Sequence, residues 1–376
     1  MRTRTLKKEF TFGAMIAIAV SLCLTGPIRS SASEPSSTLK VLTLNVWSGL
    51  DYIGTLSAGD YEPPGRRAAR FAELVRQTRE LDPDVIFLQE VNPAGRFARR
   101  LAKALGFDFV RDVYLGGIKI GPLGIPTNLR EGNATLARSG LGLKQIASWR
   151  HSGGFGFAGS FLSFHFDEIV GSLVARITVQ GLPLYLVNVH LHASPSPDAG
   201  LEARFRALQA DGTQTEESYR EGMDAWKSGI ERRSAESRDL LARIKKLGPG
   251  IPVIAAGDFN APPEAAEIAA FRDGGPFLDA GPADAFITWD PVRNPNIAFS
   301  AALRDARGKA RSGSDLLGAL DSAIARRLDY IFLGPPFGPG DILSSRIVLD
   351  SGSGGIPPSD HFGVLAEIDL GRLIRR

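Results

Sequence analysis

The distribution of apolar residues along the chain predicts strands that alternate with helices. Apolar runs and alternating patterns predict strands at residues 39–45, 84–90, 107–114, 134–138, 142–149, 173–179, 184–192, 251–259, 328–333, 342–349 and 364–368. Apolar residues at three- and four-residue spacing predict helices at residues 66–81, 93–105, 231–247, 262–272 and 315–326. This alternation indicates an α/β fold.

Glycine and proline mark the segments between these elements. Residues 49–64, 116–132 and 273–313 are predicted to be largely loops, and Gln180–Gly181 predicts the turn of a hairpin. Residues 153–166 are rich in glycine and phenylalanine. Two hypotheses fit this stretch: a strand pair that packs its rings into a core, or a surface that meets lipid.

Residues 199–247 form the longest polar and charged section of the chain. Most of this section is predicted to be helical. Residues 199–230 are expected to be a helical insertion, or a cap over one face, within a domain that spans residues 39–376.

The first 32 residues differ from the rest of the chain. Four Lys and Arg residues within positions 2–8 precede an apolar run, residues 13–24, that is short for a membrane span. Residues 30–32 are small and resemble a cleavage site. We therefore expect a signal peptide at 1–32, a flexible segment at 33–38, and a secreted or periplasmic protein.

Removal of this leader changes the chemistry of the chain. Cys23 is the only cysteine, so the mature chain would hold no disulfide. The leader carries five Lys and Arg residues and one Glu, so its removal leaves 39 basic and 40 acidic residues, a net charge of −1. This near-neutral charge gives little support to a general nucleic-acid binder. Nothing in the sequence indicates an obligate protein partner.

The stretch from Val253 to Asn260 holds the strongest local signal. A short buried strand ends at Gly257, and Asp258 and Asn260 follow. Because these two residues are two positions apart, their side chains point to one side of an extended backbone. A carboxylate beside an amide can hold a hydroxyl, a water or a phosphate oxygen, although both residues are also common in turns.

Polar residues of the same kind lie at or beside one end of several other predicted strands. They are Asn45, Glu90, His190, His192, Asp329, Asp360 and His361. Each one alone has a structural explanation as a cap, a turn residue or a satisfied core histidine. Together they indicate an active site, because the loops at strand ends commonly carry the catalytic residues of a fold.

Six short motifs occur in the order found in the endonuclease/exonuclease/phosphatase superfamily, which the chain resembles over residues 39–370. They are Leu44-Asn45, Leu88-Gln-Glu90, Val189-His190-Leu, Gly257-Asp-Phe-Asn260, Leu328-Asp329-Tyr and Ser359-Asp-His361. The resemblance implies a deoxyribonuclease I-like fold: a four-layer α/β sandwich of two mixed β-sheets flanked by helices. It also implies a metal-dependent phosphoric ester hydrolase.

The resemblance assigns a role to each matched residue. Glu90 would hold a divalent metal, with Asn45 beside it and Asp360 at a second metal position or in a supporting bond. Oxygen ligands without a thiol suit Mg²⁺, with Mn²⁺ as a substitute.

The remaining matched residues would act on the phosphoester. Asp258 would deprotonate the attacking water, Asn260 would hold that water and a phosphoryl oxygen, and His190 and His361 would bind the phosphoryl group. Asp329 would orient His361. Such a pair predicts an ionisation in the rate profile at a pH of about 6 to 8.

Two segments resemble the neutral sphingomyelinase branch of the superfamily: Asn45-Val-Trp47, and Val189-His-Leu-His-Ala193, which has Val189 where that branch has Thr. They favour a phosphodiesterase that cleaves a phospholipid such as sphingomyelin, and thus contact with membrane lipid. The chain could instead be an endonuclease or exonuclease on DNA or RNA, or a phosphomonoesterase on a small phosphorylated molecule. A non-catalytic binding module on the same fold is a further hypothesis.

Overall fold

A computed structural model describes residues 37–49, 62–120, 123–158, 164–165, 168–248, 250–273, 277–281, 286–305 and 312–375. Residues Ser37–Arg376 form one compact unit. The predicted leader and most of the predicted segment 33–38 lie outside the described residues.

The first sheet has the strand order β14-β15-β1-β2-β5-β3, and β4 pairs with β5. The bounds are β1 Thr38–Asn45, β2 Val85–Val91, β3 Phe107–Arg111, β4 Leu115–Ile120, β5 Leu123–Arg138, β14 Ile342–Val348 and β15 Gly363–Asp369. Strands β1 and β2 are parallel, whereas the other pairs are antiparallel. The sheet is therefore mixed.

The second sheet has the order β12-β13-β11-β10-β9-β6. Its strands are β6 Lys144–Ser152, β9 Val170–Val179, β10 Leu182–His190, β11 Val253–Asp258, β12 Leu278–Asp279 and β13 Asp329–Leu333. Only β10 and β11 are parallel among its described pairs, so this sheet is mixed too. The two-residue strands β7 (Gly156–Phe157) and β8 (Phe164–His165) form a separate pair.

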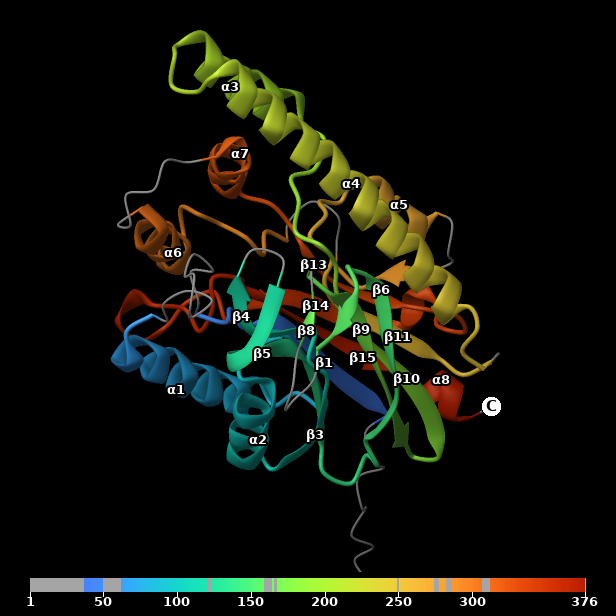
Figure 1. Ribbon diagram of the computed structural model, residues 1–376. Helices are drawn as coiled ribbons and strands as arrows, with labels where there is room; N and C mark the ends of the chain where they lie inside the picture. The colour runs from blue at the N-terminus through green and yellow to red at the C-terminus, as the bar shows by residue number, and fades with distance from the viewer. Residues whose placement is uncertain are drawn as a thin grey trace, which may run out of the picture. The chain divides into compact units, whose positions relative to one another are not determined.

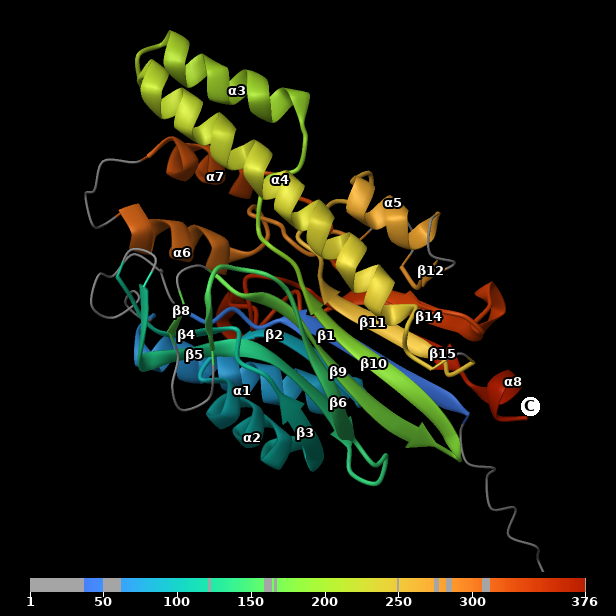
Figure 2. The same ribbon diagram turned by 45° about the vertical axis from the view of Figure 1, so that its right-hand side comes forward.

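The two sheets pack face to face, and helices cover both outer faces (Figures 1 and 2). Alternate residues of both sheets, such as Val41 and Ile254, form the core between them. The opposite side of the first sheet packs on α1 (Pro64–Leu81) and α2 (Ala94–Leu105), and that of the second sheet on α4 (Glu216–Ile244) and α5 (Ala266–Arg272). The predicted four-layer α/β sandwich is confirmed.

Helices also extend beyond the sheets (Figure 1). A small apolar cluster of Leu201, Phe205, Trp226 and Leu317 joins α3 (Ala199–Ala210), the first half of α4 and α7 (Gly313–Ser322). The remaining helices are α6 (Pro295–Asp305), α8 (Gly371–Ile374) and the 3₁₀ turns Pro339–Asp341 and Ser353–Gly355. The helical content predicted for 199–247 is therefore present; that residues 199–230 are an insertion stays a prediction.

Two local predictions differ from the structure, and one open alternative is decided. Residues 116–120 and 123–132 form most of the β4–β5 hairpin rather than a loop, and residues 295–305 form α6. Pairing of β4 with β5 outweighs the turn preference of the glycine and proline residues, and within this stretch only Gly132 pairs with β2. Phe155 is 77% exposed and Phe157 is 51% exposed, so neither ring packs into the core.

Among the described residues, no helix has both the length and the apolar character needed to cross a membrane.

Candidate active site

The sheet topology brings the predicted site residues to one edge of the sandwich. The parallel pairs β1–β2 and β10–β11 end together, which pairs Asn45 with Gln89 and His190 with Asp258. Strand β13 runs the other way, so its first residue, Asp329, pairs with Asp258. Residues that are 213 positions apart, such as Asn45 and Asp258, therefore come into hydrogen-bonding distance.

Gly257 permits the close approach of β10 and β11 directly before Asp258. Its φ angle is +151°, and a Cβ atom there would lie 1.9 Å from the carbonyl oxygen of Val189. No side chain fits this space, because real Cβ atoms do not come that near to another heavy atom. Glycine at this position is thus a steric requirement of the strand pair that carries His190 and Asp258.

Asp258 lies at the centre of the site and is 1% exposed. Its Oδ2 atom accepts a hydrogen bond from Asn45 Nδ2 at 3.1 Å and lies 3.8 Å from Nε2 of both His190 and His361. Its Oδ1 atom accepts a hydrogen bond from the backbone N–H of Asn260 at 2.8 Å. One carboxylate therefore faces donors from several different loops, which fixes its orientation.

Asn45 also joins Asp258 to Glu90. Its Nδ2 atom donates to Glu90 Oε1 at 3.0 Å, and the N–H of Ser48 donates to Glu90 Oε2 at 3.2 Å. The side-chain oxygen of Asn45 accepts the N–H of Trp47 at 3.0 Å. Trp47 and Glu90 have φ angles of +51° and +54°, a conformation that costs free energy for residues other than glycine and is common at functional sites.

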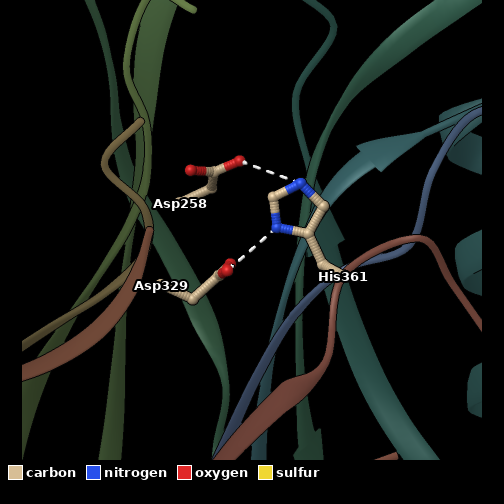
Figure 3. A group of neighbouring side chains, drawn as sticks. All are labelled: Asp258, Asp329 and His361. Carbon is tan, nitrogen blue, oxygen red and sulfur yellow. Dashed lines mark hydrogen bonds and ion pairs between the residues drawn. The ribbon is translucent and has the colours of Figure 1, made fainter. Parts of the chain in front are cut away.

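His361 and Asp329 form the predicted pair (Figure 3). His361 Nδ1 donates to Asp329 Oδ2 at 2.9 Å, while Nε2 faces Asp258. Thr288 Oγ1 lies within hydrogen-bonding distance of the N–H groups of Leu328 and Asp329, at 2.9 and 3.2 Å. The ring of Trp289 packs edge-on against His361 with centroids 5.1 Å apart. Both members of the pair are therefore held by residues outside it.

The two carboxylates change the acidity of His361. Burial by itself would lower the pKa of the imidazole, but the charges of Asp329 and Asp258 outweigh burial and raise that pKa to about 10. The expected ionisation at pH 6 to 8 does not fit the protein without metal, because His361 stays protonated through neutral pH. Burial also raises the pKa of Asp329, against the opposing charge of His361.

Asp360 is buried beside this group. Burial raises the pKa of its carboxyl to about 6, with the charge of Glu90 acting in the same direction and that of His361 opposing it. Ser359 Oγ lies 2.6 Å from the carbonyl oxygen of Asn45 and 3.2 Å from Asp360 Oδ1. Asn294 Nδ2 donates to the carbonyl oxygens of Ser359 and Asp360 at 3.0 and 2.8 Å.

The structure therefore gathers all eight predicted site residues into one group of contacts. Asn260 is included through its backbone N–H, while its Nδ2 atom donates to the carbonyl oxygen of Leu191 at 2.8 Å. His192, just beyond the end of β10, instead pairs with Glu168, its Nδ1 atom 3.0 Å from Oε2. The predicted roles of the residues in metal binding and catalysis stay predictions.

Arg70 on α1 is a supporting residue that the sequence analysis missed. Its buried guanidinium donates to the carbonyl oxygens of Val46 at 3.2 Å and Pro358 at 2.7 Å, and it stacks on the Trp47 ring at 4.4 Å. Glu62, which is fully buried, neutralises it through hydrogen bonds from Arg70 Nε of 3.1 and 3.0 Å. Arg70 thus joins the loop after Asn45 to the loop before Asp360.

Thr288, Asn294 and Trp289 were missed as well. All three lie within residues 273–313, where the sequence pattern predicts mostly loop. They carry no local signal, because their role depends on contacts with residues at the two strand ends that they support.

The donor set of the site fits a hard divalent cation. Glu90, Asp258, Asp360 and Asn45 offer carboxylate and amide oxygens, and Asp329 Oδ1 is buried without a hydrogen-bond partner. Asp258, Asp329 and His361 also place one ligand atom each within 4.8 Å of one another. The positive charge of a protonated His361 already offsets the carboxylates of Asp258 and Asp329. We therefore favour Glu90, which lies on the more exposed side of the site, as the centre of the metal site.

Fold and site together define a class: an α/β sandwich with carboxylates and histidines at the strand ends. The chain belongs to the Endonuclease/Exonuclease/phosphatase family, whose sequence pattern matches residues 42–361. Members of this family are phosphoester hydrolases that use divalent metal ions. The chain is accordingly a metal-dependent phosphoric ester hydrolase.

Solved structures of the same fold cover most of the chain. A humanised TDP2 of D. rerio is 19% identical, with 88% of this chain and 99% of that chain covered and a TM-score of 0.52. A family protein from Bacteroides thetaiotaomicron is 16% identical, with 88% and 97% covered and a TM-score of 0.51. One from Leptotrichia buccalis is 16% identical, with 88% and 99% covered and a TM-score of 0.50. A comparison with curated proteins found no match.

Proposed function

We propose that the chain is a secreted or periplasmic Mg²⁺-dependent phosphodiesterase that cleaves a phospholipid, with sphingomyelin as the first candidate substrate. The observation that carries the proposal is the convergence of Asn45, His190 and His361 on Asp258, with Glu90 directly beside them. These groups can hold a cation, a water and a phosphoryl group within one site.

Each residue has a task that follows from its contacts. Glu90, with Asn45 and Asp360, would hold Mg²⁺, which supplies positive charge to the phosphoryl oxygens when bound. Asp258 Oδ2 accepts the proton of the attacking water, and Asn260 keeps the carboxylate in place. The protonated His361, held by Asp329, and His190 donate hydrogen bonds to the oxygens on which negative charge develops.

Two features support a lipid substrate. Phe155 and Phe157 are exposed at the β7–β8 pair, where aromatic side chains can enter a lipid surface. The mature chain, without the proposed signal peptide, would have a net charge of −1, and such a charge does not favour binding along a polyanion.

The test is hydrolysis by purified residues 33–376. We expect release of the phosphorylated headgroup from phospholipid vesicles with Mg²⁺, complete loss of activity with chelator, and recovery when Mg²⁺ is restored. Asp258→Asn should lower kcat by about 10³-fold, since it removes the proton acceptor. If plasmid DNA or RNA is cleaved while no lipid is hydrolysed, the chain is a nuclease.

A phosphomonoesterase or a binding module would give different results in these assays. A phosphomonoesterase would release inorganic phosphate from small monoesters and leave diesters intact. A binding module would show no turnover, and Asp258→Asn and His361→Ala would leave its cellular role unchanged. Mass spectrometry of the N-terminus after expression with the full leader tests the proposed cleavage and export.

A further inference from the structure

A pocket of about 190 Å³ lies beside Glu90, between the loop after β1 and the helices α1 and α2. Its lining includes Trp47, Arg67, Phe71, Glu90, Phe97 and Arg100. Glu90 therefore belongs both to the pocket and to the hydrogen-bonded group around Asp258. A ligand fragment in this pocket would lie next to the reacting centre.

The walls of the pocket combine rings and cations. Phe71 and Phe97 pack edge to face with centroids 5.3 Å apart. The Arg100 guanidinium lies 3.9 Å from the centre of the Phe71 ring, and this cation–π contact limits its freedom. Arg67 donates to the carbonyl oxygen of Asn92, which anchors a second guanidinium at the pocket. The pocket thus presents an apolar surface with two fixed positive charges.

The surrounding charge has the same sign. Helix α2 carries Arg96, Arg99, Arg100 and Lys103, all exposed, and no acidic residue. Arg70, the third arginine of the lining, is neutralised by Glu62. Among the described residues that line the pocket, Glu90 is the single carboxylate, and a divalent cation bound to it would offset its charge. Among the described lining residues, positive charge therefore exceeds negative charge whenever the metal site is filled.

We propose that this pocket is a subsite for a lipid headgroup that carries a second anionic group beyond the scissile phosphate. The inference rests on the proposed phospholipid phosphodiesterase function, but it changes the first candidate substrate: it favours anionic phospholipids over sphingomyelin, whose choline headgroup is cationic. The carbon skeleton of the headgroup contacts Phe71 and Phe97, and its anion pairs with Arg100 and Arg67.

The size of the pocket favours a headgroup over a nucleic acid. A volume of about 190 Å³ accepts a fragment, because whole ligands fill pockets of roughly 300 Å³ or more. A polymer instead needs a positive groove that follows several nucleotides.

A matched pair of soluble substrates isolates the effect of the second anionic group of the headgroup from effects of binding to a membrane surface. Short-chain phosphatidylglycerol and short-chain phosphatidylglycerol phosphate differ only in a terminal phosphate on the headgroup. We expect kcat/KM to be about tenfold higher for the phosphorylated lipid, as one charge-assisted contact would give. Phosphatidylcholine of the same chain length should be the poorest of the three.

Arg100→Gln and Arg99→Gln form the matched variant pair. Both residues are exposed on α2 and lose the same charge, but only Arg100 lines the pocket. Arg100→Gln should abolish the preference by lowering kcat/KM for the phosphorylated lipid about tenfold, whereas Arg99→Gln should keep the preference. An equal effect of both variants, or no preference in the unmodified enzyme, would overturn the subsite.

A binding measurement gives an answer without turnover. Phenyl phosphate, a ring that carries an anion, is titrated calorimetrically with Mg²⁺ present into protein that carries Asp258→Asn, so that the charge of Glu90 is offset while turnover is blocked. Binding should weaken about tenfold in Arg100→Gln and stay unchanged in Arg99→Gln. If no phosphodiester is hydrolysed but this binding pattern holds, the proposed function fails and the anion pocket stands. If the enzyme instead hydrolyses DNA faster than phospholipid, and Arg100→Gln removes this advantage, the pocket binds a nucleotide.

Discussion

The described residues include two histidine–aspartate pairs of nearly equal geometry, one buried in the site and one partly exposed outside it. His361 Nδ1 lies 2.9 Å from Asp329 in the site, and His151 Nδ1 lies 2.8 Å from Asp239 between β6 and α4. The second pair even includes a serine, since His151 Nε2 lies 2.9 Å from Ser172 Oγ. By residue types alone, the pair outside the site resembles a nucleophilic triad more closely.

The surroundings of the two pairs differ in charge and access. Burial lowers the pKa of His151, and its partner Asp239 also accepts a hydrogen bond from Arg243 at 2.7 Å. His361 instead faces a second carboxylate, Asp258, and its pKa is raised. The Asp239 side chain is 36% exposed, but the Ser172 hydroxyl, which would have to react, is fully buried within β9, whereas the site is bordered by His190, whose side chain is 23% exposed. Chemistry therefore follows from convergent charges and an open side rather than from the pair itself.

The largest expected effect concerns activity. His361→Ala should lower kcat/KM by about 10³-fold or more, because it removes a donor to the developing negative charge. His151→Ala should leave kcat/KM within about threefold and lower the free energy of unfolding by roughly 1–3 kcal/mol, since Asp239 and Ser172 lose their partner. Steady-state kinetics and urea unfolding of both variants test this. An equal loss of kcat/KM in His361→Ala and His151→Ala would show that the two histidine–aspartate pairs do not differ in their role.

The second effect concerns the pH dependence of stability in chelator. A pKa raised from 6.5 to about 10 on folding means that His361 stabilises the folded protein fully below pH 6.5 and loses this contribution as the pH rises through 10. The stability difference between the unmodified protein and His361→Gln should be on the order of a few kcal/mol at pH 6 and shrink steadily toward pH 10. His151→Gln should show no such trend over this range. A constant difference for His361→Gln would contradict the raised pKa.

The smallest effect concerns the hydroxyl groups beside each pair. Thr288→Val leaves two buried N–H groups without their acceptor, so we expect a loss of about 1–3 kcal/mol in the free energy of unfolding together with reduced kcat. Ser172→Ala should cost about 1 kcal/mol and leave kcat unchanged. Chemical denaturation with parallel kinetics distinguishes the two; normal kcat in Thr288→Val would show that Asp329 needs no support from this residue.

The same contrast shows how far the sequence predicts the site. Asn45, Glu90, Asp258 and His361 were recognisable because each lies beside the end of an apolar strand and belongs to a short motif. Arg70 was not recognisable, because its meaning depends on a contact with Pro358, 288 positions away. The α/β class was accessible from the local alternation of strands and helices, whereas the four-layer arrangement was implied by the family resemblance that the motifs carry.

The β4–β5 hairpin shows the opposite case. Glycine and proline in residues 116–132 locally favour turns, yet β5 pairs along both β2 and β4. Only Gly132 and the residues after it pair with β2, so the hairpin itself is a local pairing, and its glycine and proline content hides the strand pattern that would have predicted it. The exposure of Phe155 and Phe157 was likewise undecided by composition, because core strands and exposed pairs use the same residues.

The contact between Ser359 and Asn45 joins positions 314 residues apart, near the two ends of the folded unit. A ribosome must therefore release almost the whole polypeptide before the first and last motifs can meet. Until then, a nascent or prematurely terminated product would have no assembled hydrolytic centre. A cell that makes this hydrolase is thus protected from its partial translation products by the order in which the motifs are synthesised.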